Sequence, residues 1–124
     1  MATTVEQLKR TKGWRKPPNS VVVSRPSRWG NPWVIQQTAT GWRVIRPGHG
    51  ETVHFDTLDA AARFAMARFG RWVEESTDPD AAWIREHVHE LTGKTLLCWC
   101  RPLHPCHAYN LAVLADHHDS EKRP

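Results

Sequence analysis

The sequence has no apolar run close to the roughly 18 residues that span a membrane. Its longest apolar stretches, such as Val21–Val23 and Thr95–Trp99, are short. The first ten residues, MATTVEQLKR, also lack the apolar core of a signal peptide. We therefore expect no association with a membrane and a protein that is kept in the cytoplasm.

Several motifs that identify common enzyme classes are absent. The chain contains no P-loop, no G-x-G-x-x-G and no H-E-x-x-H, and it has no internal repeat. Cysteine is scarce, because only Cys98, Cys100 and Cys106 occur, all within nine residues. An odd count packed this tightly is a poor disulfide framework. In a reducing compartment, clustered thiols indicate metal binding or reactivity instead.

The composition is that of one globular domain. The chain has 124 residues, of which 40% are hydrophobic and 24% are charged. The formal net charge of +4 favours an anionic partner, either a small molecule or a nucleic acid. Seven tryptophans are many for this length, and several stand beside Arg or Lys, a mixture that suits flat ligands and phosphates.

The pattern of apolar residues predicts an α/β or α+β fold with a small sheet and about three helices. We expect a basic N-terminal arm over 1–19, a single domain over 20–116 and a polar tail over 117–124. The predicted elements are strands at 20–24, 33–37, 41–46, 52–55 and 94–100 and helices at 57–75, 78–93 and 105–116. Residues 33–55 would form an antiparallel hairpin or meander.

The first and last strands, 20–24 and 94–100, would form a central parallel pair. The second is nearly all apolar, which is typical of a strand covered on both faces. Carboxyl ends of parallel strands lie at one edge of a sheet, where ligands of open α/β sheets bind. The loops 25–32 and 101–105 both begin at that edge, so we expect one shared site.

The segment from Cys98 to His107 leaves three interpretations open. It can be catalytic, with Cys100 or Cys106 as nucleophile and His107 as base, because a thiol at a helix start has a lowered pKa. It can instead be a zinc site formed by Cys98, Cys100, Cys106 and either His104 or His107. In the third interpretation, Cys98 is simply a buried apolar residue. We therefore expect a site without a cofactor, and the alternative is a site that binds zinc.

The segment RPSRWGNP indicates a binding loop. Arg25 offers a planar fork for phosphate or carboxylate, and Ser27 and Asn31 offer short hydrogen bonds. Trp29 supplies a stacking face, and Gly30 lets the backbone approach a ligand closely. The structural alternative is a rigid turn in which Trp29 packs in a small satellite core.

Five short motifs together resemble a known family. They are Pro17-Pro18-Asn19, Arg25-Pro26-Ser27, Trp29-Gly30-Asn31-Pro32, Leu97-Cys98-Trp99-Cys100 and Pro105-Cys106-His107. This set resembles domain of unknown function 4326, a family of small bacterial and phage proteins, over about residues 13–114. The resemblance implies no established activity.

Two functions follow from the residues. The first is an enzyme that acts on a nucleoside, a nucleotide or a nucleic-acid base at a C–N bond. Arg25 and Ser27 would hold an anionic group, Trp29 and Asn31 a base, and Cys100, Cys106 and His107 would lie at the reacting centre. The second is a non-catalytic nucleic-acid-binding module in which zinc holds the Cys/His segment. Small size alone is compatible with a third, a protein-interaction module.

Overall fold

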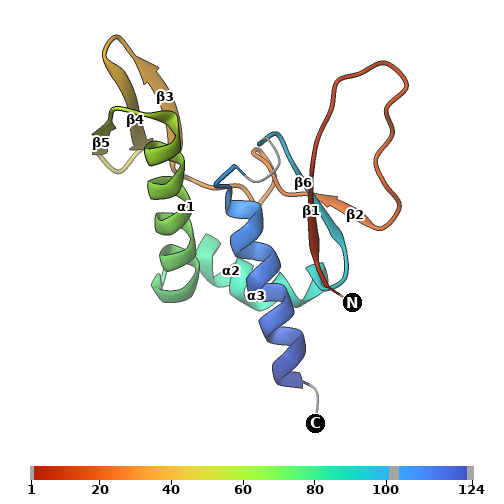
Figure 1. The fold of residues 1–124 in the computed structure, drawn as a ribbon. Coiled ribbons are helices and arrows are strands. Elements are labelled where there is room, and N and C mark those ends of the chain that lie inside the picture. Colours follow the sequence, from red (N-terminus) through yellow and green to blue (C-terminus); the bar gives the residue numbers. More distant parts are fainter. Residues whose placement is uncertain (1, 101–103, 123–124) are drawn as a thin grey trace.

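The computed structural model describes residues 2–100 and 104–122 of the chain. Its elements are β1 (Thr4–Gln7), β2 (Ser20–Val22), β3 (Val34–Thr38), β4 (Gly41–Arg46), β5 (Glu51–Phe55), α1 (Leu58–Glu75), α2 (Pro79–His87), the 3₁₀ helix η1 (Val88–Leu91), β6 (Thr95–Cys98) and α3 (His107–Lys122). Over these residues the fold is α+β, with one parallel and one antiparallel sheet, as predicted (Figure 1). No helix within the described ranges is long and apolar enough to cross a membrane.

The parallel sheet has the strand order β1-β6-β2, with β6 in the middle. Leu96 and Leu97 of β6 are fully buried, which explains the apolar run that predicted a covered strand. Strand β2 runs parallel to β6, with Val22 beside Leu97. The predicted pairing of these two strands is therefore confirmed, and their carboxyl ends lie at the same edge.

The N-terminal segment differs from the expected irregular arm. Thr4–Gln7 forms β1, which pairs with β6 along its whole length. Thr3 anchors this edge strand, because its backbone N–H and its hydroxyl both donate to the Asp116 carboxylate, at 3.0 and 2.7 Å. Four residues of strand with no partner nearby in sequence give little local signal. At the other end, α3 continues to Lys122, through most of the expected polar tail.

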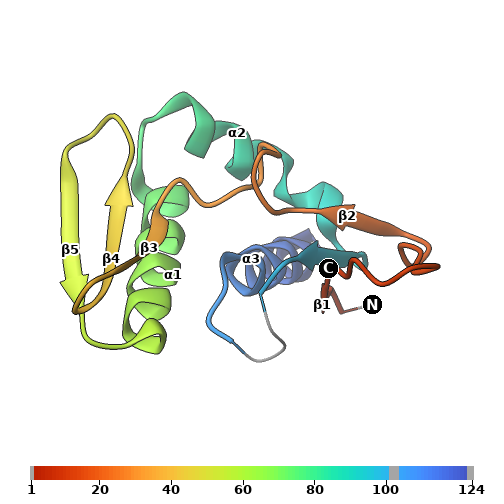
Figure 2. The ribbon, with the colours of Figure 1, turned by 90° about the horizontal axis from the view of Figure 1, so that it is seen from above.

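The antiparallel sheet is the predicted meander, in the order β3-β4-β5. Ile35 of β3 lies opposite Val44 of β4, whose side chain is fully buried. Helix α1 begins after its N-cap Thr57, whose hydroxyl accepts from the Ala60 N–H at 3.1 Å. Seen from above, α1 lies between the antiparallel sheet and α3 (Figure 2). Its buried stripe consists of Ala61, Ala62, Ala65, Phe69, Trp72 and Val73.

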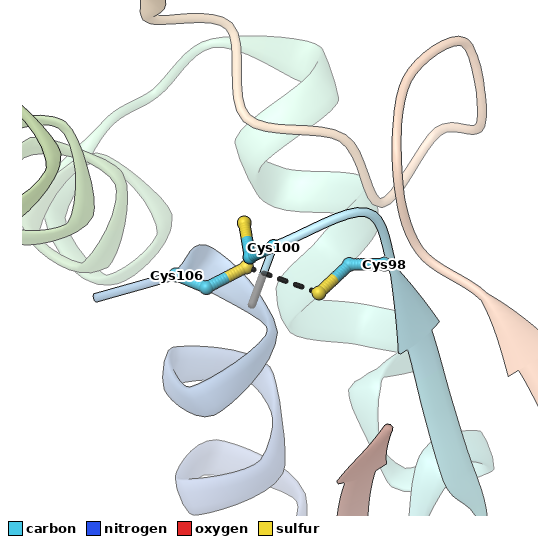
Figure 3. Close-up of side chains that lie close together, drawn as sticks. All are labelled: Cys98, Cys100 and Cys106. Carbon is cyan, nitrogen blue, oxygen red and sulfur yellow. Dashed lines mark hydrogen bonds between the residues drawn. The ribbon is translucent and has the colours of Figure 1, made fainter. Parts of the chain in front are cut away.

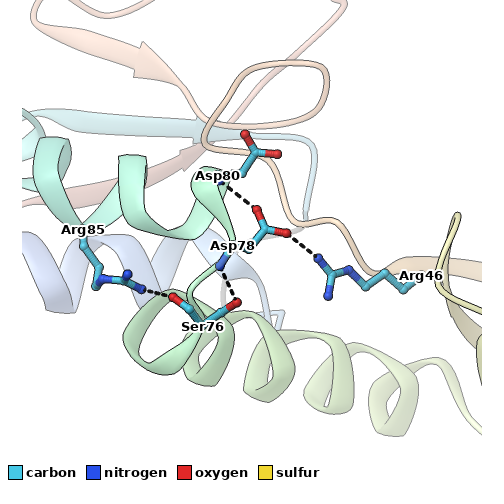
Figure 4. A network of polar contacts seen from close by, with 5 residues as sticks. All are labelled: Arg46, Ser76, Asp78, Asp80 and Arg85. Carbon is cyan, nitrogen blue, oxygen red and sulfur yellow. Dashed lines mark hydrogen bonds and ion pairs between the residues drawn. The ribbon is translucent and has the colours of Figure 1, made fainter.

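A polar network fixes the join between α1 and α2 (Figure 4). Asp78 caps α2, as predicted, and accepts from the Asp80 N–H at 2.8 Å. The second carboxylate oxygen of Asp78 lies 3.4 Å from Arg46 Nη2, which belongs to β4. Arg85 donates to the Ser76 carbonyl at 2.8 Å. Arg46 thereby holds the antiparallel sheet to the join between α1 and α2.

Candidate functional site

A cleft of about 270 Å³ opens at the carboxyl edge of the parallel sheet. Five parts of the chain line it: the loop after β2, strand β3, helix α1, the end of β6 with the residues that follow, and the start of α3 with the two residues before it. Its walls comprise Ser24, Arg25, Asn31, Trp33, Ile35, Ala62, Ala65, Cys98, Trp99, Cys100, Pro105, Cys106 and His107. The two motif segments thus meet in one cavity. Of the loop expected at 101–105, residues 101–103 lie outside the described part of the chain.

Three cysteine thiols converge on one side of this cleft (Figure 3). Cys98 Sγ and Cys106 Sγ are 3.2 Å apart, and the sulfur atoms of Cys98, Cys100 and Cys106 all lie within 4.8 Å of one another. In a tetrahedral zinc site with Zn–S bonds of about 2.3 Å, the sulfur atoms would lie about 3.8 Å apart. The cluster can therefore hold a metal ion with small side-chain movements.

The local sequence explains this convergence. Cys98 is the last residue of β6, and Cys100 follows two positions later, where the chain leaves the sheet. Cys106 directly precedes α3, and the backbone of Ala108 in its first turn hydrogen-bonds the Cys106 sulfur. A helix N-terminus favours negative charge, and the Ala108 hydrogen bond lowers the pKa of Cys106 as expected for a thiol at a helix start, but the neighbouring thiols and burial outweigh it. Cys98 and Cys106 are buried and Cys100 is half-buried.

The three thiols influence one another's acidity. Hydrogen bonds from Cys100 and Cys106 lower the pKa of Cys98. The hydrogen bonds with Cys100 and Cys98, together with burial, raise the pKa of Cys106. For Cys100, the hydrogen bond with Cys106 lowers the pKa, but the bond with Cys98 and burial outweigh it. Within the cluster, loss of a proton is thus easier from Cys98 than from Cys100 or Cys106, and a bound cation would favour deprotonation of all three.

His107 stands next to the sulfur cluster in a defined tautomer. Its Nε2 lies 2.7 Å from the Val23 carbonyl oxygen, and since a carbonyl cannot donate, Nε2 carries the proton. Burial lowers the pKa of His107, which keeps the ring neutral. Its Nδ1 therefore accepts a hydrogen bond from the Cys106 thiol, whose sulfur is 3.7 Å away. Metal-binding histidines commonly donate their second ring N–H to a backbone carbonyl in this way.

Arg25 supplies the positive charge of the cleft. Its Nη1 donates to the carbonyl oxygens of Asn31 at 2.6 Å and Trp33 at 3.3 Å, so the guanidinium is held by its own loop. The side chain is exposed, and its charge acts to lower the pKa of both Cys100 and His107. The loop also contains a cis Arg25–Pro26 peptide bond and two successive turns closed by Ser27 and Gly30.

The other predicted binding residues of this loop serve the loop itself. Trp29 is buried, with its ring 4.8 Å from that of Trp83, and does not line the cleft. Gly30 packs on Arg25, because a Cβ at Gly30 would lie 2.9 Å from Arg25 Cγ. Ser27 Oγ is buried, has no hydrogen-bond partner among the described residues and lies off the cleft wall.

Asn31 lines the cleft, yet its amide is already engaged. Its Nδ2 donates to the Ala65 carbonyl of α1 at 3.0 Å, and its Oδ1 accepts from the Trp33 N–H at 2.9 Å. It therefore ties the loop to α1. The sequence interpretation missed Trp99 as a site residue, although this side chain lines the cleft and is 45% exposed. The position of Trp99 between two cysteines at the end of a strand is the sequence signal that could have identified it.

The family comparison agrees with the motifs. A family model described as Domain of unknown function (DUF4326) matches residues 6–117. The match includes every residue of the cleft. No curated protein and no solved structure matches the chain.

Proposed function

The chain belongs to the DUF4326 family, and we propose that its cleft is the active site of an enzyme acting on a nucleoside, a nucleotide or a nucleic-acid base. The convergence of three thiols with a guanidinium in one cavity at the carboxyl edge of the sheet carries this proposal. Structural cysteines need no adjacent open space, whereas a reacting centre needs a cavity for its substrate, and a guanidinium in that cavity can hold an anionic group.

Arg25 is the residue proposed to bind an anionic group of the substrate. Only its Nη1 takes part in hydrogen bonds within the described residues, which leaves the rest of its N–H fork for phosphate. Because its loop fixes the guanidinium, little side-chain entropy is lost on binding. Trp29 and Asn31 are engaged elsewhere, so the base would contact Trp99 and the cleft walls instead.

We further propose that the metal ion is zinc, bound by Cys98, Cys100 and Cys106. Thiolates are preferred zinc ligands, and catalytic zinc sites have three protein ligands and one open position. Bound zinc lowers the pKa of a coordinated water toward neutrality. Hydrolysis of a C–N bond would then form a bond from the water oxygen to carbon, while the nitrogen leaves with a proton. A reducing compartment such as the cytoplasm keeps the three thiols available.

One observation favours a second function. The tautomer of His107 directs the Nδ1 lone pair toward Cys106, so a movement of the ring toward Cys98 and Cys100 would make His107 a fourth zinc ligand. A site closed by four protein ligands is structural. In that case the protein is a non-catalytic nucleic-acid-binding module that zinc stabilises.

The metal is tested by elemental mass spectrometry of the untagged protein. We expect about one zinc per chain, and none in Cys106→Ser, because two thiolates bind zinc far more weakly than three. Val113→Ser is the matched control, since it introduces the same residue on the solvent-facing side of α3, where Val113 is 68% exposed. An equal zinc content in both variants would show that Cys106 is not a zinc ligand.

Cobalt substitution distinguishes the two functions. An open coordination position lets added azide change the visible spectrum of the Co²⁺ protein, whereas four protein ligands leave it unchanged. With the position open, we expect nucleosides, nucleotides or bases to raise the melting temperature and at least one of them to be hydrolysed. Cys106→Ser would abolish that turnover while remaining folded. Zinc-loaded protein that neither binds nor converts any of these compounds contradicts the enzyme.

A further inference from the structure

An exposed tryptophan at the mouth of the cleft is the starting point. All seven tryptophans lie in the described residues, and Trp99 is the one that is exposed, at 45%. Its ring lines the cleft and also a shallow hollow that Leu58, Cys100 and His104 complete. The Arg10 guanidinium lies 4.6 Å from the centre of the ring. A flat aromatic face is thus presented to solvent beside Cys100, next to a cation.

The chain that carries Arg10 brings more positive charge to this edge. Residues 8–19 leave β1 at Gln7, which pairs with Cys98, and return at the start of β2 (Figure 1). This segment contains five exposed basic side chains: Lys9, Arg10, Lys12, Arg15 and Lys16. We call it the basic loop.

The charges of the basic loop stand in a part of the sequence that is poor in carboxylates. Residues 7–50 contain nine Lys and Arg and no Asp or Glu. No carboxylate in the described part of the chain forms a salt bridge with the basic loop, whereas Arg63 and Arg71 of α1 are each paired with a carboxylate. A run of unpaired cations raises the free energy of the free protein through mutual repulsion and suits a partner with repeated negative charge.

We propose that the basic loop and Trp99 bind single-stranded nucleic acid and lead a base of that strand to the cleft. Lysines and arginines neutralise successive phosphates, and an exposed aromatic ring stacks on an unpaired base. In a duplex the bases are already paired and stacked on one another, so none of them is available to stack on the Trp99 ring. A mononucleotide engages few of the five charges. The inference rests on the proposed function, since it names the substrate class of the same cleft.

Fluorescence anisotropy with labelled dT15 and rU15 tests the proposal on zinc-loaded protein. We expect at least one of these strands to bind at least tenfold more tightly than a 15-base-pair duplex or than unlabelled dTMP measured by competition. Its affinity should fall linearly with salt on logarithmic axes. Equal affinity for strand and duplex, or no binding of either strand at 50 mM salt, overturns the proposal.

Two variants separate the ring from the charges. Trp99→Ala should weaken strand binding about 5- to 150-fold, the factor that corresponds to losing one stacked base. Arg10→Gln/Lys12→Gln should lower the magnitude of the salt slope by about 1.4, since two phosphate contacts are lost. The matched control Arg63→Gln/Arg71→Gln removes the same charge from exposed positions on α1. It should change the affinity by less than about twofold and the salt slope by less than about 0.7, the contribution of one phosphate contact.

The controls distinguish this inference from the proposed function. Loss of binding in the α1 control equal to that in the loop variant means that net charge alone attracts the strand, which overturns the basic loop as the binding surface. If Trp99→Ala binds the strand as tightly as the unmodified protein and has the same circular dichroism spectrum, the proposal that the Trp99 ring stacks on a base is refuted. Nucleoside hydrolysis without strand binding refutes this inference and leaves the enzyme. Strand binding with no turnover of any substrate refutes the enzyme and leaves this inference.

Discussion

The two motif segments at the carboxyl edge look equally rich in chemistry, but the structure uses them in opposite ways. Residues 25–33 direct Trp29 and most of their hydrogen bonds toward their own loop, α1 and α2, and of the three of them that line the cleft Arg25 alone is exposed. Residues 98–100 and 105–107 leave three thiols and an imidazole nitrogen facing one cavity. A loop rich in turn residues can therefore be either a structural scaffold or a ligand-binding site. Only the contacts that its side chains make distinguish the two roles.

The comparison is tested most strongly by Trp29→Ala. The ring is buried against Trp83, so its removal leaves a large cavity, and we expect the free energy of unfolding to fall by about 3–5 kcal/mol. Urea denaturation followed by circular dichroism measures the change. A loss of nucleotide binding without a loss of stability would contradict the scaffold role and restore Trp29 as a ligand contact.

Asn31→Ala should have the next largest effect. The Trp33 N–H loses its acceptor in a buried place, and the tie to the Ala65 carbonyl is lost, which costs about 1–3 kcal/mol. Gln36→Ala is the control, because the Gln36 side chain accepts from the exposed Arg43 and its removal should cost less than about 0.5 kcal/mol. Equal unfolding midpoints for the two variants would show that Asn31 does not hold the loop.

Gly30→Ala sharpens the comparison at the point where the loop supports Arg25. The new Cβ would lie 2.9 Å from Arg25 Cγ and 3.1 Å from its backbone N, so the loop must shift, at a cost of about 1–3 kcal/mol. Binding of inorganic phosphate or nucleotide should weaken as Arg25 moves. Gly70→Ala, where the Cβ meets only the amide end of Asn110, gains helix propensity and should cost less. The reverse ranking of the two variants would refute this packing argument.

Trp99→Ala should have the smallest effect on stability. The ring is exposed and its main contact is with the Arg10 guanidinium, so the free energy of unfolding should change by less than about 1 kcal/mol. Trp29→Ala measured in the same urea series provides the contrast. A cost above 3 kcal/mol for Trp99→Ala would mean that this ring belongs to the core.

Much of the fold could be predicted, because it depends on local signals. The apolar run of β6, the meander and the Asp78-Pro79 start of α2 each have a pattern or a capping residue within a few positions. Strand β1 could not be predicted from local signals, since Thr4–Gln7 is stabilised by pairing with β6, about ninety residues away in sequence. The cysteine cluster was visible as a spacing, but the distances between its sulfur atoms depend on how α3 packs beside β6.

The sequence by itself determined which residue types stand at the carboxyl ends of the parallel strands. Periodicity and turn residues act over a few positions, so they place Arg25, Cys98 and Cys100 at strand ends and Cys106 at a helix start. Only the tertiary structure decided which of these side chains meet and which tryptophan remains exposed. Trp29 and Trp99 both follow a strand beside polar residues, yet α2 covers the first with Trp83, whereas the ring of the second remains 45% exposed. Burial depends on distant elements, and a local pattern cannot report it.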